Sequence, residues 1–138
     1  MVDPRYPVVM IGGVPVVDAP QALHADSAES FRTLLLHAAD RGHGTVVVNM
    51  AGTRFCDPAA MVVLAWAHGH AVAKGGQLLM VIPASAAVLR AFALAGIDRL
   101  IPNFTHLNEA LDQAQAVVPR PLQRPVTSSA DVGLPEAQ

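Results

Sequence analysis

Cysteine, histidine and carboxylate side chains are the groups of this sequence that could carry out chemistry. Cys56 is the single cysteine, and it lies just before a predicted helix start, where the helix dipole lowers the pKa of a thiol. No histidine lies close to it in the sequence, however, and a lone cysteine beside Phe55 is more often a small buried hydrophobic residue. A packing role is therefore favoured over a reactive thiol.

The histidines lack the spacing of a metal site. His68 and His70 are two residues apart on a predicted helix, so their side chains point roughly 200° apart at about 3.6 residues per turn. A zinc pair on a helix requires a spacing of about three or four residues. A single cysteine also excludes a four-cysteine zinc site and an internal disulfide. We expect neither a metal nor a cofactor.

The glycines and carboxylates do not form a catalytic motif. Gly12-Gly13 and Gly75-Gly76 match neither a P-loop nor a dinucleotide-binding turn. The acidic residues are spread singly, which leaves no carboxylate pair for acid–base catalysis. Asp57 directly precedes Pro58, and an aspartate before a proline is typical of a helix N-cap. The residue chemistry therefore predicts that the protein is not an enzyme.

Composition and charge narrow the function classes further. The chain has 138 residues, of which 52% are hydrophobic and 14% charged, so a single globular domain is expected and a wholly disordered chain is excluded. The formal net charge is −2, and no basic stripe interleaved with aromatic residues marks a nucleic-acid-binding surface. The longest apolar run, residues 59–67, is far shorter than the roughly 20 residues that span a bilayer. With no secretory signal either, the sequence predicts a soluble cytoplasmic domain.

The elements that would position these residues alternate between strands and helices. Residues 6–17 are rich in β-branched side chains and interrupted by glycine and proline, which predicts one or two edge strands with a bend. A capping box at residues 26–29 then opens a first helix. Its apolar face is predicted at Phe31, Leu34, Leu35 and Ala38. Residues 45–50 form a continuous apolar run that is typical of a strand buried on both faces.

The second half of the chain repeats this alternation. A helix is predicted from Pro58 to about Ala73, ended by residues 74–76, and a buried strand at residues 77–82 follows it. A third helix, opened by Pro83 and Ser85, ends at Gly96, and a short strand is expected near Leu100 and Ile101. Thr105 is the expected cap of a last helix. The apolar face of that helix is predicted at Leu107, Ala110, Leu111 and Ala114.

This order of elements predicts an α/β fold with a single mixed, mostly parallel sheet of about four to five strands and about four helices. From Pro119 onward, prolines are frequent and helical periodicity is lost. We therefore expect a folded domain at residues 1–118 and a flexible, proline-rich tail at residues 119–138.

Three segments together resemble the STAS domain family, the fold of bacterial anti-sigma factor antagonists. They are Val46–Met61, Lys74–Pro83 and Ala95–Pro102. The family pattern is a hydrophobic strand, a Phe-x-Asp-Ser-Ser-Gly loop that opens a helix, a Gly-Gly pair before a second strand, and a Gly-Ile/Leu-Asp step before a last strand. The resemblance covers about residues 7–116 and implies the STAS fold.

The resemblance also implies a partner and a switch. In the family, the loop serine is phosphorylated by an anti-sigma factor that is itself a protein kinase. The unmodified antagonist captures that kinase and frees a sigma factor, whereas the added charge of about −1.5 to −2 breaks the complex. Matched residue by residue, Asp57 is the motif aspartate. Pro58 stands at the first serine, Ala59 at the phosphorylated serine and Ala60 at the glycine.

These departures decide the expected mechanism. Alanine has no hydroxyl, so we expect a binder that is not switched by phosphorylation at Ala59. The expected partner-binding loop comprises Phe55, Cys56, Asp57, Pro58, Ala59, Ala60 and Met61. Thr53 carries the nearest hydroxyl and is either an alternative phosphoacceptor or an ordinary turn threonine. Two further departures are His24 and Asn49, which stand where the family often has aspartate.

Two other functions stay open at this stage. Because Pro58 and Ala60 change the shape of the loop as well as its chemistry, the protein could serve as a scaffold or decoy among other STAS proteins. STAS-like folds also occur as transporter subunits, so an accessory domain of a transporter is the alternative from a different class. The expected partners are thus an anti-sigma factor kinase or related STAS regulators, with no nucleic acid and no membrane, and the oligomeric state stays open.

Overall fold

Five strands form one mixed sheet at the centre of the molecule, in the order β1-β2-β4-β6-β7. The computed structural model describes residues 7–117. The strand bounds are β1 Val8–Ile11, β2 Val14–Asp18, β4 Val46–Asn49, β6 Leu78–Val81 and β7 Asn103–Phe104. β1 runs antiparallel to β2, and every other neighbouring pair is parallel. A separate parallel ladder joins β3 (Ala22–Leu23) to β5 (Phe55–Cys56).

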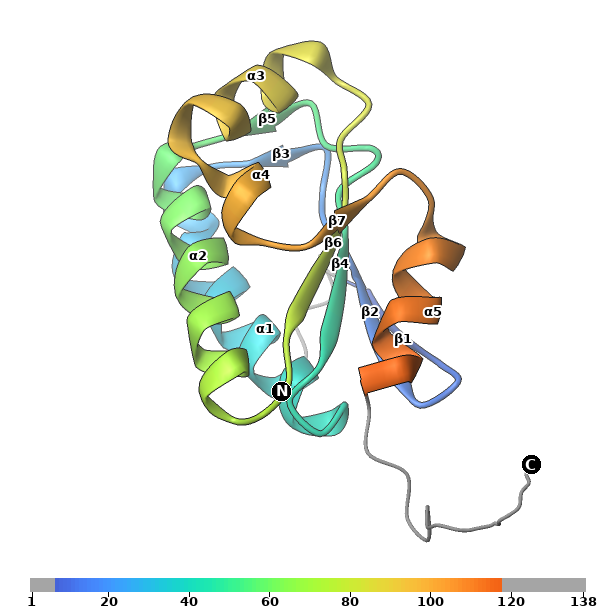
Figure 1. Cartoon of the computed structure of the whole chain (residues 1–138). Helices are drawn as coiled ribbons and strands as arrows, with labels where there is room; N and C mark the ends of the chain where they lie inside the picture. The colour runs from blue at the N-terminus through green and yellow to red at the C-terminus, as the bar shows by residue number, and fades with distance from the viewer. Residues whose placement is uncertain (1–6, 118–138) are drawn as a thin grey trace, which may run out of the picture.

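Helices cover both faces of this sheet. Their bounds are α1 Ala28–Arg41, α2 Pro58–Ala73, α3 Ala86–Ala95, α4 Ile97–Leu100 and α5 Leu107–Val117, with a 3-10 turn at Ala25–Ser27. Figure 1 shows α1 and α2 side by side on one face and α5 on the other. The predicted fold class, an α/β fold with a mixed and mostly parallel sheet, is confirmed. Among the described residues, five α-helices stand where about four were expected.

The sheet separates two hydrophobic cores, which explains why its central strands are apolar without alternation. Val46, Val48 and Met80 point towards α1 and α2, whereas Val47 and Leu79 point towards α5. Because successive side chains of a strand point to opposite faces, a strand that is covered on both sides must be apolar throughout. The predictions of buried strands at residues 45–50 and 77–82 are therefore confirmed.

The predicted apolar helix faces are also confirmed. In α1, the buried side chains include Phe31, Leu34, Leu35 and Ala38. In α5, Ala110 and Ala114 are fully buried, and Leu107 and Leu111 pack against the same core. Each helix thus binds the sheet through the face that its spacing indicated.

The N-terminal hairpin explains how a proline fits into an interior strand. β2 was expected at an edge, but it lies between β1 and β4. The N–H of Asp18 donates to the Pro7 carbonyl at 3.1 Å, so by alternation the nitrogen of Pro15 points away from β1. The pairing with β4 begins only at Val16. The missing N–H of Pro15 therefore removes no bond from either ladder.

Two predictions for the segments around α1 and α4 are wrong. The capping box expected at residues 26–29 is absent: Ser27 precedes α1 without a side-chain cap, and a 3-10 turn leads into the helix instead. The strand expected near Leu100 and Ile101 is replaced by α4, because Gly96, with φ of +77°, ends α3 and its carbonyl accepts the N–H groups of Arg99 and Leu100. The strand forms two residues later, at β7.

The last helix, α5, begins one residue later than the predicted Thr105 cap implies. α5 begins at Leu107, so His106 rather than Thr105 directly precedes it, and the Glu109 carboxylate accepts the His106 N–H at 3.3 Å. The tail predicted at residues 119–138 lies outside the described residues. Within residues 7–117, the helices are too short or too polar to span a bilayer.

Candidate functional site

The expected partner-binding loop, Phe55–Met61, comprises β5, the N-cap Asp57 and the first turn of α2, and backbone hydrogen bonds fix its start. The N–H groups of Arg54 and Phe55 donate to the Gln21 carbonyl at 2.7 and 3.2 Å, and the Asp57 N–H donates to the Leu23 carbonyl at 2.8 Å. These bonds join the loop to β3, a segment more than thirty residues earlier in the chain. The loop is therefore held in one conformation before any partner binds.

Asp57 is the N-cap of α2, as predicted. Its backbone is extended, with φ of −67° and ψ of 147°, and its Oδ1 accepts the Ala59 N–H at 2.8 Å. Pro58 occupies the first helical position, where its lack of an N–H costs nothing. The Asp57 carbonyl accepts the N–H groups of Ala60 and Met61. Asp57 thus accepts hydrogen bonds from all the backbone N–H groups of the first turn of α2.

The side chains of the loop divide into an outer and an inner set. Phe55, with 45% of its surface exposed, and Pro58 face the solvent. Cys56, Ala60 and Met61 are buried in the core. Of the residues expected to meet a partner, Cys56 and Ala60 instead hold the loop against the domain. Met61 packs against the core and also lines an apolar groove on the surface.

Cys56 has the surroundings of a packing residue. Burial first, and the negative charge of Asp57 second, raise the pKa of its thiol to about 12. Its Sγ lies 3.8 Å from the Asp57 carbonyl oxygen, to which it can donate a weak hydrogen bond. A thiol with such a pKa stays protonated near neutral pH and is a poor nucleophile. The geometry therefore agrees with the packing interpretation.

Thr53 is buried as well. Its side chain is fully shielded from solvent, and its Oγ1 donates to the Pro20 carbonyl at 2.9 Å. Phosphoryl transfer to this hydroxyl would require the bond to Pro20 to break and the segment to open.

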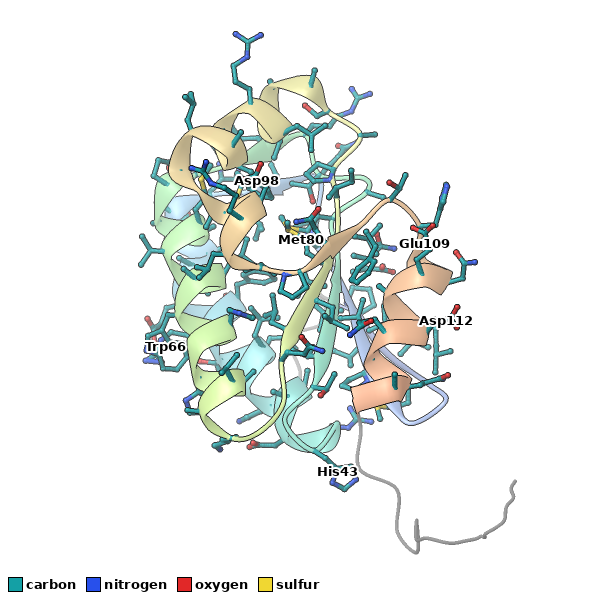
Figure 2. The ribbon with its side chains drawn as sticks, viewed as in Figure 1. His43, Trp66, Met80, Asp98, Glu109 and Asp112 are labelled. Carbon is teal, nitrogen blue, oxygen red and sulfur yellow. The ribbon has the colours of Figure 1, made fainter. Side chains whose placement is uncertain are left out.

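The two histidines on α2 have different surroundings. Burial lowers the pKa of His68, whose Nδ1 is buried without a hydrogen-bond partner among the described residues. His70 stacks on Trp66 with 5.1 Å between ring centroids, and the Arg32 guanidinium lies 4.6 Å from the Trp66 centroid on the surface. Figure 2 shows Trp66 on the outer side of α2. Residues 7–117 contain no group of three or more metal-ligating side chains.

The two departures from the family's aspartates have local roles. Asn49 ends β4, and its Oδ1 accepts the Ala51 N–H at 3.1 Å, which starts the turn that leads to the loop. The ring of His24 lies 5.2 Å from the ring of Phe55. His24 therefore supports the exposed aromatic side chain of the loop.

An apolar groove beside the loop was not predicted from the sequence. It has a volume of about 270 Å³ and is lined by Pro58, Met61, Val62, Ala65, Ala95 and Ile97. Val62 and Leu94, at the groove or next to it in the chain, are 68% and 83% exposed. One signal was present: the sequence of α2 is apolar on its outer as well as its inner face, which indicates contacts on both. The walls contributed by α3 and α4 were not visible without the fold.

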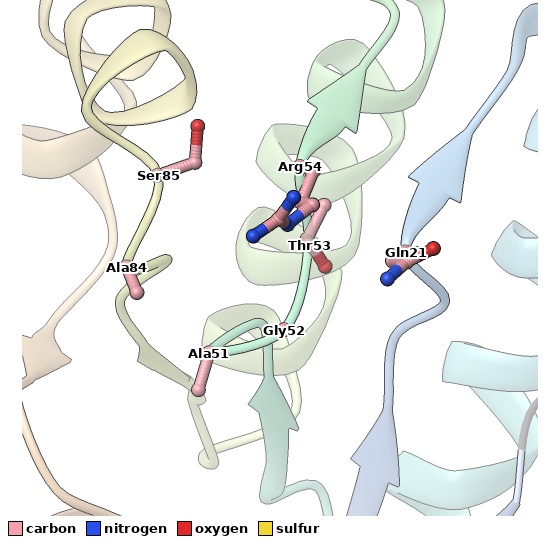
Figure 3. A pocket seen from close by; sticks show the side chains of 7 residues that line it. All are labelled: Gln21, Ala51, Gly52, Thr53, Arg54, Ala84 and Ser85. Carbon is pink, nitrogen blue, oxygen red and sulfur yellow. The ribbon is translucent and has the colours of Figure 1, made fainter.

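A second hollow, a more polar cleft of about 550 Å³, opens on the other side of the loop. It lies where β4 and β6 end, and its lining comprises Gln21, Ala51, Gly52, Thr53, Arg54, Ala84 and Ser85. Figure 3 shows the Arg54 side chain extending across it towards Ser85. The hydroxyl of Ser85 is engaged as the N-cap of α3, accepting the Val88 N–H at 3.3 Å. Arg54 is thus the charged group that this cleft offers.

Solved structures with the same fold include anti-sigma factor antagonists and a transporter domain. The unphosphorylated anti-sigma factor antagonist SpoIIAA is 19% identical, with a TM-score of 0.68 over 83% of this chain and 99% of that one. An anti-sigma factor antagonist from Mycobacterium paratuberculosis is also 19% identical, with a TM-score of 0.67 over 83% and 99% of the two chains. The murine anion transporter Slc26a9 is 23% identical, with a TM-score of 0.60 over 77% of this chain and 18% of the transporter.

Sequence comparison identifies the family. A comparison with curated proteins found no match. The family model described as the Mlab STAS domain matches residues 9–102, which include both central strands and the loop with its helix. The chain therefore belongs to the STAS domain family.

Proposed function

We propose that the protein is a non-enzymatic, anti-sigma factor antagonist-like binding protein that acts in the cytoplasm. Its partner is an anti-sigma factor kinase or a related regulator, and it binds through the loop Phe55–Met61 and the adjoining groove. The observation that carries the proposal is the exposed apolar surface at the start of α2, where Ala59 occupies the position of the family's phosphorylated serine.

The chemistry of this surface favours a protein partner over a small molecule. Small-molecule sites enclose most of their ligand and add a few converging polar groups. The groove is shallow and almost wholly apolar, and it continues onto the exposed Val62 and Leu94 side chains. Exposed apolar patches rimmed by polar residues typically mark protein interfaces. Pro58 lines the groove, and the exposed aromatic ring of Phe55 lies three residues earlier in the same loop. Aromatic side chains are enriched among the residues that contribute most to the binding energy of protein interfaces.

The lack of an accessible hydroxyl in the loop supports binding that phosphorylation does not switch off. The loop from Phe55 to Met61 contains no hydroxyl. Thr53, the alternative phosphoacceptor, has its hydroxyl buried and bonded to Pro20. A kinase bound at the loop would therefore meet no hydroxyl within the loop itself, and it would reach that of Thr53 only after local opening.

A transporter-associated role is the second candidate. Its support is the fold likeness to the anion transporter Slc26a9, of which the match covers 18%. In that case the same surface would bind a permease or its ATPase. In the scaffold or decoy role, it would bind another STAS protein instead of a kinase. The candidates are separated by which partner binds the groove.

The experiment compares two valines on the same helix. Val62 lines the groove, and the similarly exposed Val72 lies at the other end of α2. With a purified anti-sigma factor kinase and titration calorimetry, Val62→Glu should weaken binding at least about 10-fold, which corresponds to about 1.4 kcal/mol. Val72→Glu should leave the affinity unchanged. Equal effects of the two variants, or binding of a transporter ATPase in place of the kinase, would overturn the proposal.

A further inference from the structure

The outer edge of β1 is an unusual surface for a sheet edge. β1 is an edge strand of the five-stranded sheet, and its residues Val8–Ile11 are all uncharged and apolar. Val9 is 51% exposed, and Met10 and Ile11 are exposed as well. Edge strands normally carry a charge, a proline or a bulge that prevents pairing with another chain. β1 contains none of the three.

The opposite edge of the sheet is protected. β7 is only two residues long, and the side-chain amide of Asn103 is turned onto the carbonyls of Asp98 and Ile101 at 2.7 and 2.9 Å. A short edge with its polar side chain engaged offers little to an added strand. The contrast indicates that the exposed edge of β1 is a specific feature of this chain.

The hairpin register shows which backbone groups of β1 do not pair with β2 within residues 7–117. Because the Asp18 N–H donates to the Pro7 carbonyl, the N–H and C=O groups of Val9 and Ile11 also point to β2 by alternation. Those of Val8 and Met10 point outward. The strand therefore presents two donors and two acceptors at the edge, with Val9 between them.

We infer that β1 is a homodimer interface, in which two copies pair antiparallel about a two-fold axis at Val9. In this register Val8 lies opposite Met10 of the second copy and Met10 lies opposite its Val8, so all outward groups form four backbone hydrogen bonds. An axis at Met10 would form only two within the strand. The two Val9 side chains then face each other as a non-hydrogen-bonded pair, the arrangement with the closest side chains.

A second copy fits this edge because the strand is uncharged. An interface about a two-fold axis brings each side chain near the axis against itself, so a charge there would be repelled. β1 places an uncharged valine on the axis, and it offers no charge by which a different partner could be selected. The dimer would extend the sheet continuously, with Val9 and Ile11 of both copies on the α5 side.

The dimer does not compete with the proposed partner surface. Figure 1 shows β1 at one edge of the sheet and the start of α2 near the opposite end of the molecule. A dimer would therefore present two partner-binding loops at once. The inference does not depend on the identity of that partner.

The test uses the full chain and analytical ultracentrifugation across a wide concentration range. Four-residue strand pairing buries less than the roughly 1,200 Å² typical of stable complexes, so we expect dissociation in the range of about 10–300 µM. Val9→Lys and Val9→Glu should each weaken dimerisation at least about 10-fold through like charges at the axis. An equimolar mixture of the two variants should restore a dimer, and native mass spectrometry should identify it as mixed.

Controls separate this outcome from the alternatives. Val72→Lys changes a valine of matching exposure, 52%, that lies outside both the sheet edge and the groove, and it should leave dimerisation unchanged. Thermal unfolding checks that each variant folds. If the wild-type protein stays monomeric at about 300 µM, the inference is wrong. A dimer that Val9→Lys does not weaken, or a mixture of variants that stays monomeric, overturns it as well.

Discussion

Replacing Asp57 by alanine is the most informative single perturbation of the loop. In the first turn of α2, Pro58 has no N–H, and the Asp57 carbonyl accepts the N–H groups of Ala60 and Met61. The Ala59 N–H is therefore the donor that relies on the Asp57 side chain, at 2.8 Å. Asp57→Ala removes this acceptor and leaves the other bonds intact.

The expected loss is that of one N-cap. Replacing a capping aspartate by alanine costs about 0.5–2 kcal/mol of unfolding free energy. For a domain of this size, each kcal/mol lowers the melting temperature by roughly 4 °C. Asp57→Asn is the matched control, because it keeps an acceptor oxygen and removes only the charge at the helix N-terminus, a contribution of about 0.3–1 kcal/mol.

Urea unfolding at neutral pH measures both variants. The single tryptophan, Trp66, lies on α2 and reports on the helix directly. We expect Asp57→Ala to lower the unfolding midpoint clearly and Asp57→Asn to lower it less. If Asp57→Ala has the midpoint of the wild type, the hydrogen bond to Ala59 does not stabilise α2 and the capping argument is wrong. Equal loss in both variants would assign the effect to charge instead.

Three further outcomes follow from the same structure. Cys56 should resist thiol reagents in the native protein at pH 8 and react with them once the protein is unfolded. Its pKa is raised to about 12 in the folded state, so the thiol of the unfolded chain ionises at a lower pH. The free energy of unfolding, measured by urea titration, should therefore fall as the pH rises above about 9. Gly96 has a φ of +77°, so Gly96→Ala should lower the free energy of unfolding by about 1–2 kcal/mol. Gly69 lies on the exposed face of α2, where an added Cβ would meet no atom within 4 Å, so Gly69→Ala should raise it by about 0.5–1 kcal/mol in the same assay. Thr53→Val leaves the Pro20 carbonyl unpaired and should lower stability by about 1–3 kcal/mol without changing partner affinity, which calorimetry would check.

The parts of the fold that the sequence predicted are those with strong local signals. The continuous apolar runs of β4 and β6 required a strand covered on both faces, and the pair Asp57-Pro58 marked the start of α2. The segment after Gly96 lacked such a signal, because Ile97, Leu100 and Ile101 fit a helical turn as well as a strand. The left-handed turn at Gly96 decided between them.

The sequence indicated where the candidate loop lies in the chain, but not the shape of the surface around it. The loop itself was found from its motif, yet the ladder that fixes it depends on backbone bonds to Gln21 and Leu23, which leave no periodicity in the sequence. The groove requires α2 and the α3–α4 segment to meet, so Ile97 could not be assigned to it from spacing alone. Burial of Cys56 and Thr53 likewise depends on tertiary packing.

One measurement tests the central claim most directly. The purified protein is mixed with an anti-sigma factor kinase, the proposed partner, and the mixture is followed by native mass spectrometry before and after ATP is added. We predict a complex that persists with ATP, with no phosphate between Phe55 and Met61, where no side chain carries a hydroxyl. The variant Pro58→Ser/Ala59→Ser/Ala60→Gly restores the family's serines and glycine and should gain phosphate and ATP-dependent release, since the added charge disfavours the apolar interface. No complex at all, or phosphate on Thr53 of the wild type with release by ATP, would contradict the account.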